Sequence, residues 1–124
     1  MPYIASEPEK YSGQVVGTGQ CVAFVQTASA APHTPNWKRS ANKVKGDLSI
    51  AKGTAIATFN ANGQYTNSLD GTSHAAIYVS QDEVGITVWD QWTGQPVHTR
   101  VIRFRGGAEG VKPVNDGDAF YVIE

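Results

Sequence analysis

The sequence predicts an α+β fold in which helices near the N-terminus pack on an antiparallel sheet of about five strands. Two segments with apolar residues at helical spacing come first, and runs rich in β-branched and aromatic residues follow them. This order, with helices first and then strands, implies an antiparallel sheet with the helices on one side. The 124 residues contain no internal repeat or linker, so we expect a single domain over residues 1–124.

The composition excludes several classes of protein. Hydrophobic residues make up 40% of the chain and charged residues 17%, which is typical of a soluble globular protein and not of a disordered one. A net charge of -1 gives no electrostatic reason to expect nucleic acid or a membrane surface as a partner. No apolar run approaches the roughly 20 residues of a membrane span.

The first residues do not resemble a secretory signal. They include Glu7, Glu9 and Lys10 and lack the apolar stretch that such a signal requires. We therefore expect the chain to be made in the cytoplasm. Export by a specialised secretion system to act in a periplasm stays open, because such a route needs no cleaved signal.

The helix that opens the fold is expected over residues 19–31. Residues 1–17 before it are polar and contain proline, which predicts an irregular lead. Thr18 is a suitable N-cap, and Pro32 cannot continue the helix. The apolar stripe at helical spacing consists of Cys21, Phe24, Val25 and Ala28.

Residues 36–45 are expected to form a second helix. Asn36 would cap it and Gly46 would end it. Its inner face would consist of Trp37, Ala41 and Val44.

The rest of the chain is expected to form the sheet. Strands are predicted over residues 53–59, 74–80, 85–92, 99–105 and 119–123. The second and third of these form a hairpin through residues 81–84. The stretch from 60 to 72 is expected to be irregular, and residues 106–110 are expected to form a flexible loop.

Cys21 is the only cysteine, and it lies where a catalytic cysteine would. The run Gly17-Thr18-Gly19-Gln20-Cys21 leads from a glycine-rich turn directly into the first helical turn. There the unpaired backbone N–H groups and the helix dipole favour the thiolate, which is the nucleophilic form. The alternative is structural, because a free cysteine is often a small buried hydrophobe and Cys21 belongs to the apolar stripe.

A thiol nucleophile needs a base and a group that orients the base. His74, at the start of a predicted strand, is the best candidate for the base. Strand alternation places His74 on one face and, in the partner strand, Asp90 on the face shared with Trp92. The hairpin can therefore bring Asp90 beside His74, where its carboxylate would accept an imidazole N–H.

Other residues compete for these roles. His33 and His98 are expected to be loop residues, and Asp70 is expected to serve a turn. Gln91 is the rival of Asp90 as orienter, although alternation directs it to the opposite face of the strand.

The arginines near the C-terminus offer a structural alternative for Asp90, which could pair with Arg100 or Arg103. Together with Arg105 they are expected to form a solvated strand face. An acidic peptide or an anionic glycan as their partner is the weaker alternative.

Three further residues are candidates for the substrate site. Gln20 has a side-chain amide that could donate to an oxyanion together with the backbone N–H of Cys21. Trp37 and Trp92 are candidates to line the cleft, with a place in the core as the structural alternative. One cysteine and three scattered histidines do not give metal-ligand spacing, so no metal or other cofactor is expected.

These motifs, in this order, resemble the CHAP and NlpC/P60 cysteine peptidases, which are papain-like amidases that cut peptide bonds in bacterial cell walls. The segments that carry the resemblance are Gly19-Gln20-Cys21, Ser73-His74-Ala75-Ala76-Ile77-Tyr78-Val79 and Ile86-Thr87-Val88-Trp89-Asp90-Gln91-Trp92. The chain also resembles the small amidase effectors that type VI secretion injects into rival bacteria.

The resemblance implies a papain-like fold and hydrolysis of amide bonds in peptidoglycan peptides through a thioester. It implies that Cys21 is the nucleophile, His74 the base and Asp90 the third catalytic residue, with Gln20 preceding the nucleophile. Aspartate departs from the glutamate, asparagine or histidine usual at the third position. A cognate immunity protein is an implied partner. The alternative function is a non-catalytic module of this fold that binds wall fragments or a protein partner.

Overall fold

The computed structural model describes all residues, 1–124, and consists of one α-helix and a six-stranded antiparallel sheet. The strands follow the order β1-β6-β2-β3-β4-β5 across the sheet. The α-helix and strands are α1 (Cys21–Ser29), β1 (Arg39–Lys43), β2 (Ala55–Thr58), β3 (Ala75–Gln81), β4 (Gly85–Trp92), β5 (Gln95–Arg103) and β6 (Phe120–Ile123). Four short 3₁₀ helices are η1 (Pro8–Tyr11), η2 (Thr34–Asn36), η3 (Pro113–Asn115) and η4 (Gly117–Ala119).

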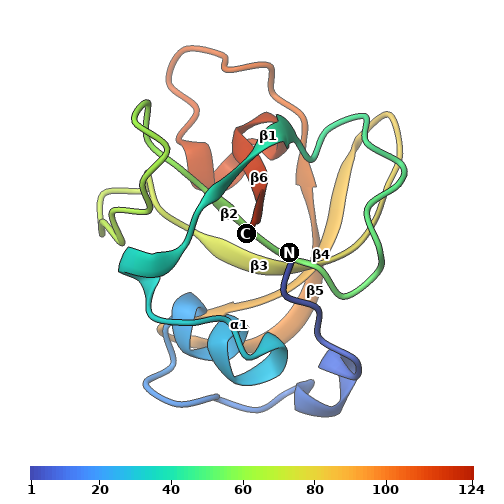
Figure 1. Cartoon of the computed structure of the whole chain (residues 1–124), viewed down its shortest axis with the longest axis vertical. Coiled ribbons are helices and arrows are strands. Elements are labelled where there is room, and N and C mark those ends of the chain that lie inside the picture. Colours follow the sequence, from blue (N-terminus) through green and yellow to red (C-terminus); the bar gives the residue numbers. More distant parts are fainter.

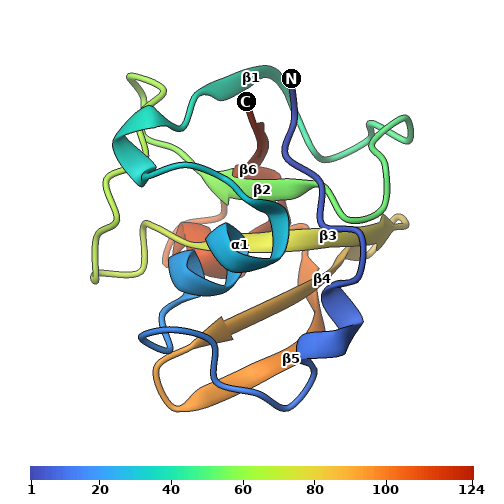
Figure 2. The same ribbon diagram turned by 60° about the horizontal axis from the view of Figure 1, so that its bottom comes forward.

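The helix lies against one side of the sheet, where it contacts β3 and β4 (Figures 1 and 2). The two chain termini lie close together in both views. The predicted α+β class with an antiparallel sheet is confirmed. No helix in the structure has the length and apolar character needed to span a bilayer.

Both faces of the central strands are covered, so β2 is buried along its whole length. Phe24 and Val25 of α1 pack in the cluster on one face, with Ile77 of β3. The cluster on the other face consists of Val44, Ile56, Ala76, Tyr78, Ile86, Val88, Ile102 and Phe120. Alternate residues of the central strands therefore belong to different cores, as the pleat requires.

The helix predicted over residues 36–45 is wrong. The segment contains the single turn η2 and then the edge strand β1, which pairs with β6. The backbone N–H of Lys38 donates to the carbonyl of Glu124 at 2.9 Å, and that of Glu124 donates to the carbonyl of Lys38 at 2.7 Å. Because this partner lies at the far end of the chain, tertiary pairing overrides the local helical spacing.

Other boundaries also differ from the prediction. The helix is shorter than residues 19–31, and Gln20 is its N-cap in place of Thr18. It ends because Ala30 adopts the left-handed conformation, with φ of 61°. The residues before it are not wholly irregular, since they include η1 and a bridge between Ile4 and Thr54.

The last hairpin begins earlier than predicted. Strand β5 starts at Gln95, directly after a tight turn at Gly94, whose φ of 92° suits glycine. Trp92 therefore pairs with Gln95, and Asp90 pairs with His98. His98 is thus a strand residue and not the loop residue that the sequence suggested.

We expect Phe24→Ala to lower the free energy of unfolding by about 3–5 kcal/mol, since the ring is fully buried between helix and sheet. Thr27→Ala, on the exposed side of the same helix, is the control and should change it by less than about 0.5 kcal/mol. Chemical denaturation followed by circular dichroism measures both. Equal midpoints for the two variants would contradict the packing described for α1.

Candidate active site

Three elements bring the predicted site residues together. Cys21 begins α1, His74 directly precedes β3, and Asp90 lies near the end of β4. Since β3 and β4 are antiparallel, the start of one lies beside the end of the other (Figure 2). Cys21 and His74 line the same pocket, which is about 350 Å³ in volume.

His74 is held by its backbone as well as by its ring. Its N–H donates to Oγ1 of Thr58 at 3.0 Å, and its carbonyl accepts from the N–H of Thr58 at 3.0 Å. The ring nitrogen Nε2 lies 2.8 Å from Oδ2 of Asp90, and both side chains are buried. Because Asp90 occupies Nε2, the nitrogen left to face Cys21 is Nδ1.

Asp90 is a fully buried carboxylate with three basic neighbours. Nε of Arg100 donates to Oδ2 at 2.7 Å, and Nε2 of His98 lies 3.0 Å from Oδ1. Burial raises the pKa of Asp90. The hydrogen bond to His74 and the charges of His74 and Arg100 lower this pKa by more than burial raises it, so it lies below its usual value. In the structure, the side chain that forms a hydrogen bond with the imidazole of His74 is therefore that of Asp90 and not that of Gln91.

The pKa values of Cys21 and His74 move in opposite directions. Burial raises the pKa of the thiol, but a hydrogen bond to His74 and its charge outweigh burial, so the pKa lies below the usual 9.0. Burial lowers the pKa of His74, but hydrogen bonds to Asp90 and Cys21 raise it to about 9. These shifts favour the thiolate–imidazolium pair over the neutral thiol and imidazole.

Tyr65 is a residue of the site that the sequence analysis missed. Its hydroxyl oxygen lies 3.8 Å from Sγ of Cys21, and its ring is buried against Trp37 and Phe59. Burial, and then the charge of Cys21, raise the pKa of Tyr65, so the hydroxyl keeps its proton and can donate. The one sequence signal is a large aromatic residue within an otherwise polar loop.

Gln91 holds the turn that precedes Cys21. Its Nε2 donates to the carbonyls of Val16 and Gln20, both at 2.8 Å, and its Oε1 accepts from the N–H of Val16 at 2.9 Å. The amide is fully buried on the face of β4 opposite Asp90. Gly17 allows the tight turn, since it has φ of 57° and a Cβ there would lie 2.9 Å from that of Ala23.

The pocket beside Cys21 includes two of the three predicted substrate-site residues. Gln20 is exposed at its edge, and its side-chain amide makes no hydrogen bond. Trp92 is 40% exposed, and its ring centroid lies 6.4 Å from that of His74. Leu69, from the loop before β3, also lines the pocket and is 94% exposed.

Trp37 lies elsewhere, which corrects its expected place in the cleft. The side chain is buried in the core, and its Nε1 donates to the carbonyl of Pro32 at 2.8 Å. It reaches the site only through Tyr65, whose ring centroid is 4.7 Å away. An aromatic ring with a satisfied N–H is favoured in a core, which explains the difference.

The remaining candidates take structural positions. His33 is exposed beside η2, and Asp70 accepts from the N–H of Thr72 at 3.1 Å in a turn, as expected. Arg100 differs from the expected solvated face, since it pairs with Asp90 and lies 5.1 Å over the ring of Trp92.

Comparison with known proteins identifies relatives of the whole chain. The family model described as "Domesticated amidase effector 2" (Dae2) matches residues 2–123. A protein of that name from Ixodes scapularis is 40% identical over 125 residues, covering 96% of this chain and 82% of the relative. The "Type VI secretion amidase effector 2 protein" of Salmonella typhi is 32% identical over 136 residues, covering all of both chains.

The solved structure of "Type 6 secretion amidase effector 2 (Tae2)" matches this fold with a TM-score of 0.83 and 31% sequence identity. The match covers 98% of this chain and 94% of that one. The resemblance to small type VI amidase effectors is therefore confirmed. The chain belongs to the domesticated amidase effector 2 family.

Proposed function

We propose that this protein is a cysteine amidase that hydrolyses amide bonds in peptidoglycan peptides. The observation that carries the proposal is the buried hydrogen bond of 2.8 Å between His74 and Asp90, beside a thiol whose pKa is lowered at the start of α1. Both relatives are named as amidase effectors, which supports an amidase activity for this chain. We take the catalytic unit to be one domain that spans residues 1–124.

The first step is attack of the Cys21 thiolate on the carbonyl carbon of the amide. The oxyanion that forms accepts from the N–H of Cys21, which has no partner within the helix because it lies in the first turn. The exposed amide of Gln20 and the hydroxyl of Tyr65 are further donors. The imidazolium of His74 then protonates the leaving amine from Nδ1, and the C–N bond breaks to leave a thioester.

Water completes the reaction. Neutral His74 accepts a proton from water at Nδ1, and the hydroxide attacks the thioester carbonyl. The C–S bond breaks, which releases a carboxylic acid and returns the thiolate and imidazolium. Asp90 keeps Nε2 protonated and stabilises the imidazolium. The distance of 2.8 Å supports aspartate in this role, although its side chain is one methylene shorter than glutamate.

The name of the Salmonella typhi relative supports a place of action outside the producing cell. We propose export by a specialised secretion system and action on wall peptides in a periplasm, with an immunity protein as the cognate partner. A non-catalytic wall-binding module is the competing reading. The lowered pKa of Cys21 favours catalysis, because a structural buried thiol has its pKa raised.

Cys21→Ala should abolish release of peptide fragments from purified peptidoglycan, because no other thiol exists in the chain. Mass spectrometry of digests made with native and variant protein measures this, and the fragment masses name the bond. A thermal melt shows that the variant is folded. Fragments released by folded Cys21→Ala protein would refute the mechanism, and their absence from both digests would favour the binding module.

Asp90→Asn should lower turnover by about 10²–10⁴-fold, because the amide can hold the imidazole but stabilises its cation poorly. Asp82→Asn is the matched control, since Asp82 lies in the turn at the other end of the β3–β4 hairpin. Steady-state kinetics on soluble wall peptides separates kcat from KM. Equal kcat for the two variants would exclude Asp90 as the orienting residue.

The rate of Cys21 alkylation should depend on pH with a midpoint below 9.0, since the thiol pKa is lowered in the folded protein. In His74→Ala, Cys21 stays buried but loses the neighbouring imidazolium, so the midpoint of its alkylation should rise. Iodoacetamide labelling across pH measures both midpoints, and identical profiles for native protein and His74→Ala would refute the ion pair.

Hydrolysis by the native protein should fall as pH rises through about 9, where His74 loses its proton.

A further inference from the structure

A second hollow of about 620 Å³ lies beside the Cys21 pocket, along the end of β5 and the segment before η3. We call it the basic groove. Four of the 9 residues that line it are cationic and none is acidic; they are Arg100, Arg103, Arg105 and Lys112. The whole chain has 10 Lys and Arg against 11 Asp and Glu, so this is a local concentration of charge.

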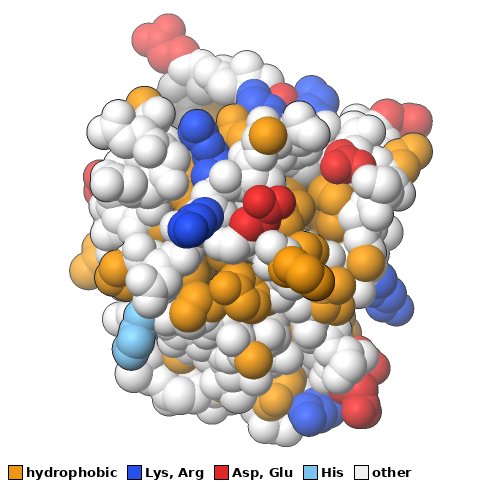
Figure 3. All heavy atoms as spheres, in the orientation of Figure 1, with side chains coloured by type: hydrophobic (Ala, Val, Ile, Leu, Met, Phe, Trp, Pro, Cys, Tyr) orange, Lys and Arg blue, Asp and Glu red, His pale blue; other side chains and the backbone are white.

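Figure 3 shows how charge is distributed over one face of the molecule. On the face shown in Figure 3, acidic and basic side chains are interspersed and no area of one sign forms. A hollow lined by charges of one sign focuses the electrostatic field and raises the local concentration of counter-ions. The basic groove is therefore suited to hold an anion.

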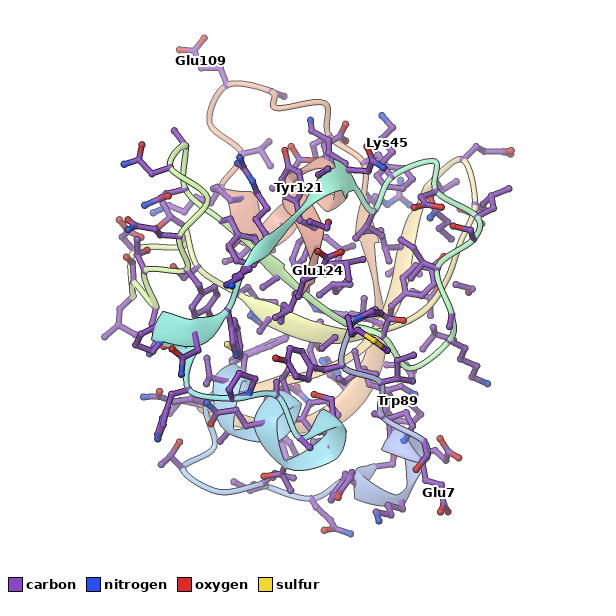
Figure 4. All side chains as sticks on the ribbon, in the orientation of Figure 1. Glu7, Lys45, Trp89, Glu109, Tyr121 and Glu124 are labelled. Atoms are coloured by element: carbon purple, nitrogen blue, oxygen red, sulfur yellow. The ribbon has the colours of Figure 1, made fainter.

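Asp90 pairs with Arg100, but the other acids near the groove leave Arg103 and Arg105 without an ion pair. Asp116 is buried and accepts from the backbone N–H groups of Arg105, Gly107 and Asp118. Glu109 stands at the tip of the loop after β5 and points away from the molecule (Figure 4). Asp70 interacts with Lys112, but its carboxylate is engaged by Thr72 and does not line the groove.

The arginines of the groove have few partners of their own. The side chains of Arg103 and Arg105 are exposed and form neither an ion pair nor a hydrogen bond within the chain. Lys112 donates to the backbone carbonyl of Asp70 at 2.6 Å. Arg103 and Arg105 have no carboxylate partner, so an anion that entered the groove would reduce the repulsion between them.

The groove adjoins the pocket of Cys21. Arg100 and Asn115 line both hollows. Arg100 uses Nε for Asp90, which leaves the terminal N–H groups of its guanidinium without a partner in the chain. A substrate held over Cys21 can therefore extend past Arg100 toward Arg103 and Arg105.

We propose that the basic groove binds the free carboxylates of the wall peptide whose amide lies at Cys21. The inference rests on the proposed function and names the part of the substrate that sets specificity. A carboxylate is favoured over a neutral group because guanidinium donors match its planar geometry. Wall peptides with free carboxylates are therefore preferred substrates over the same peptides in amidated form.

The test uses soluble wall peptides with free carboxylates and the same peptides after conversion of those carboxylates to amides. Native protein should lose about tenfold or more in kcat/KM on the amidated peptides, mainly through KM. The double variant Arg103→Gln with Arg105→Gln should lose about five- to tenfold on the free acids and discriminate little between the two substrates. Lys38→Gln with Lys52→Gln removes the same charge from exposed sites outside the groove and should behave as native protein.

Binding gives an independent measurement. The Kd values of Cys21→Ala protein, with and without the groove substitutions, are compared for both peptides. Equal discrimination by native and groove-variant protein, or equal binding of both peptides by Cys21→Ala protein, would overturn the proposal. If native protein hydrolysed neither substrate, the amidase proposal would fail, and the Kd values would still decide whether the groove recognises carboxylates.

Discussion

The buried carboxylate of Asp90 is the constraint on which the arrangement of this site depends. Removing an ionised carboxylate from water is costly unless donors surround it. Here His74 and Arg100 donate to Oδ2 at 2.8 and 2.7 Å, whereas Oδ1 accepts no hydrogen bond and has only the ring of His98 nearby, at 3.0 Å. These partners come from the start of β3 and from β5, on either side of β4. The packing that makes the charge tolerable therefore also orients the proposed catalytic base.

The residue after Asp90 serves the other half of the site. Gln91 faces the opposite side of β4 and binds the turn that leads into Cys21, through Val16 and Gln20. One strand thus holds both the imidazole and the segment that carries the thiol. Because successive side chains alternate across a strand, two adjacent residues can serve two layers of the fold. The spacing between proposed nucleophile and base is fixed by this single rigid element.

Much of this arrangement is determined by local sequence patterns. Apolar spacing predicts α1, and period-two alternation with turn residues predicts the strands from β2 to β6 within a few residues. The glycine-rich turn places Cys21 in the first helical turn. Alternation within one hairpin places Asp90 on the side of His74. Each of these features depends on residues that are close in the chain or that belong to the same β-hairpin.

Only the tertiary structure decided the features that depend on distant partners. The segment over residues 36–45 becomes β1 because β6, at the far end of the chain, supplies its hydrogen bonds. Tyr65 reaches Cys21 from a loop whose conformation no local pattern specifies. The cations of the basic groove meet because the end of β5 lies beside the segment before η3. Strand pairing and charge clusters of this kind depend on packing between distant segments, so the spacing of residues in the sequence does not predict them.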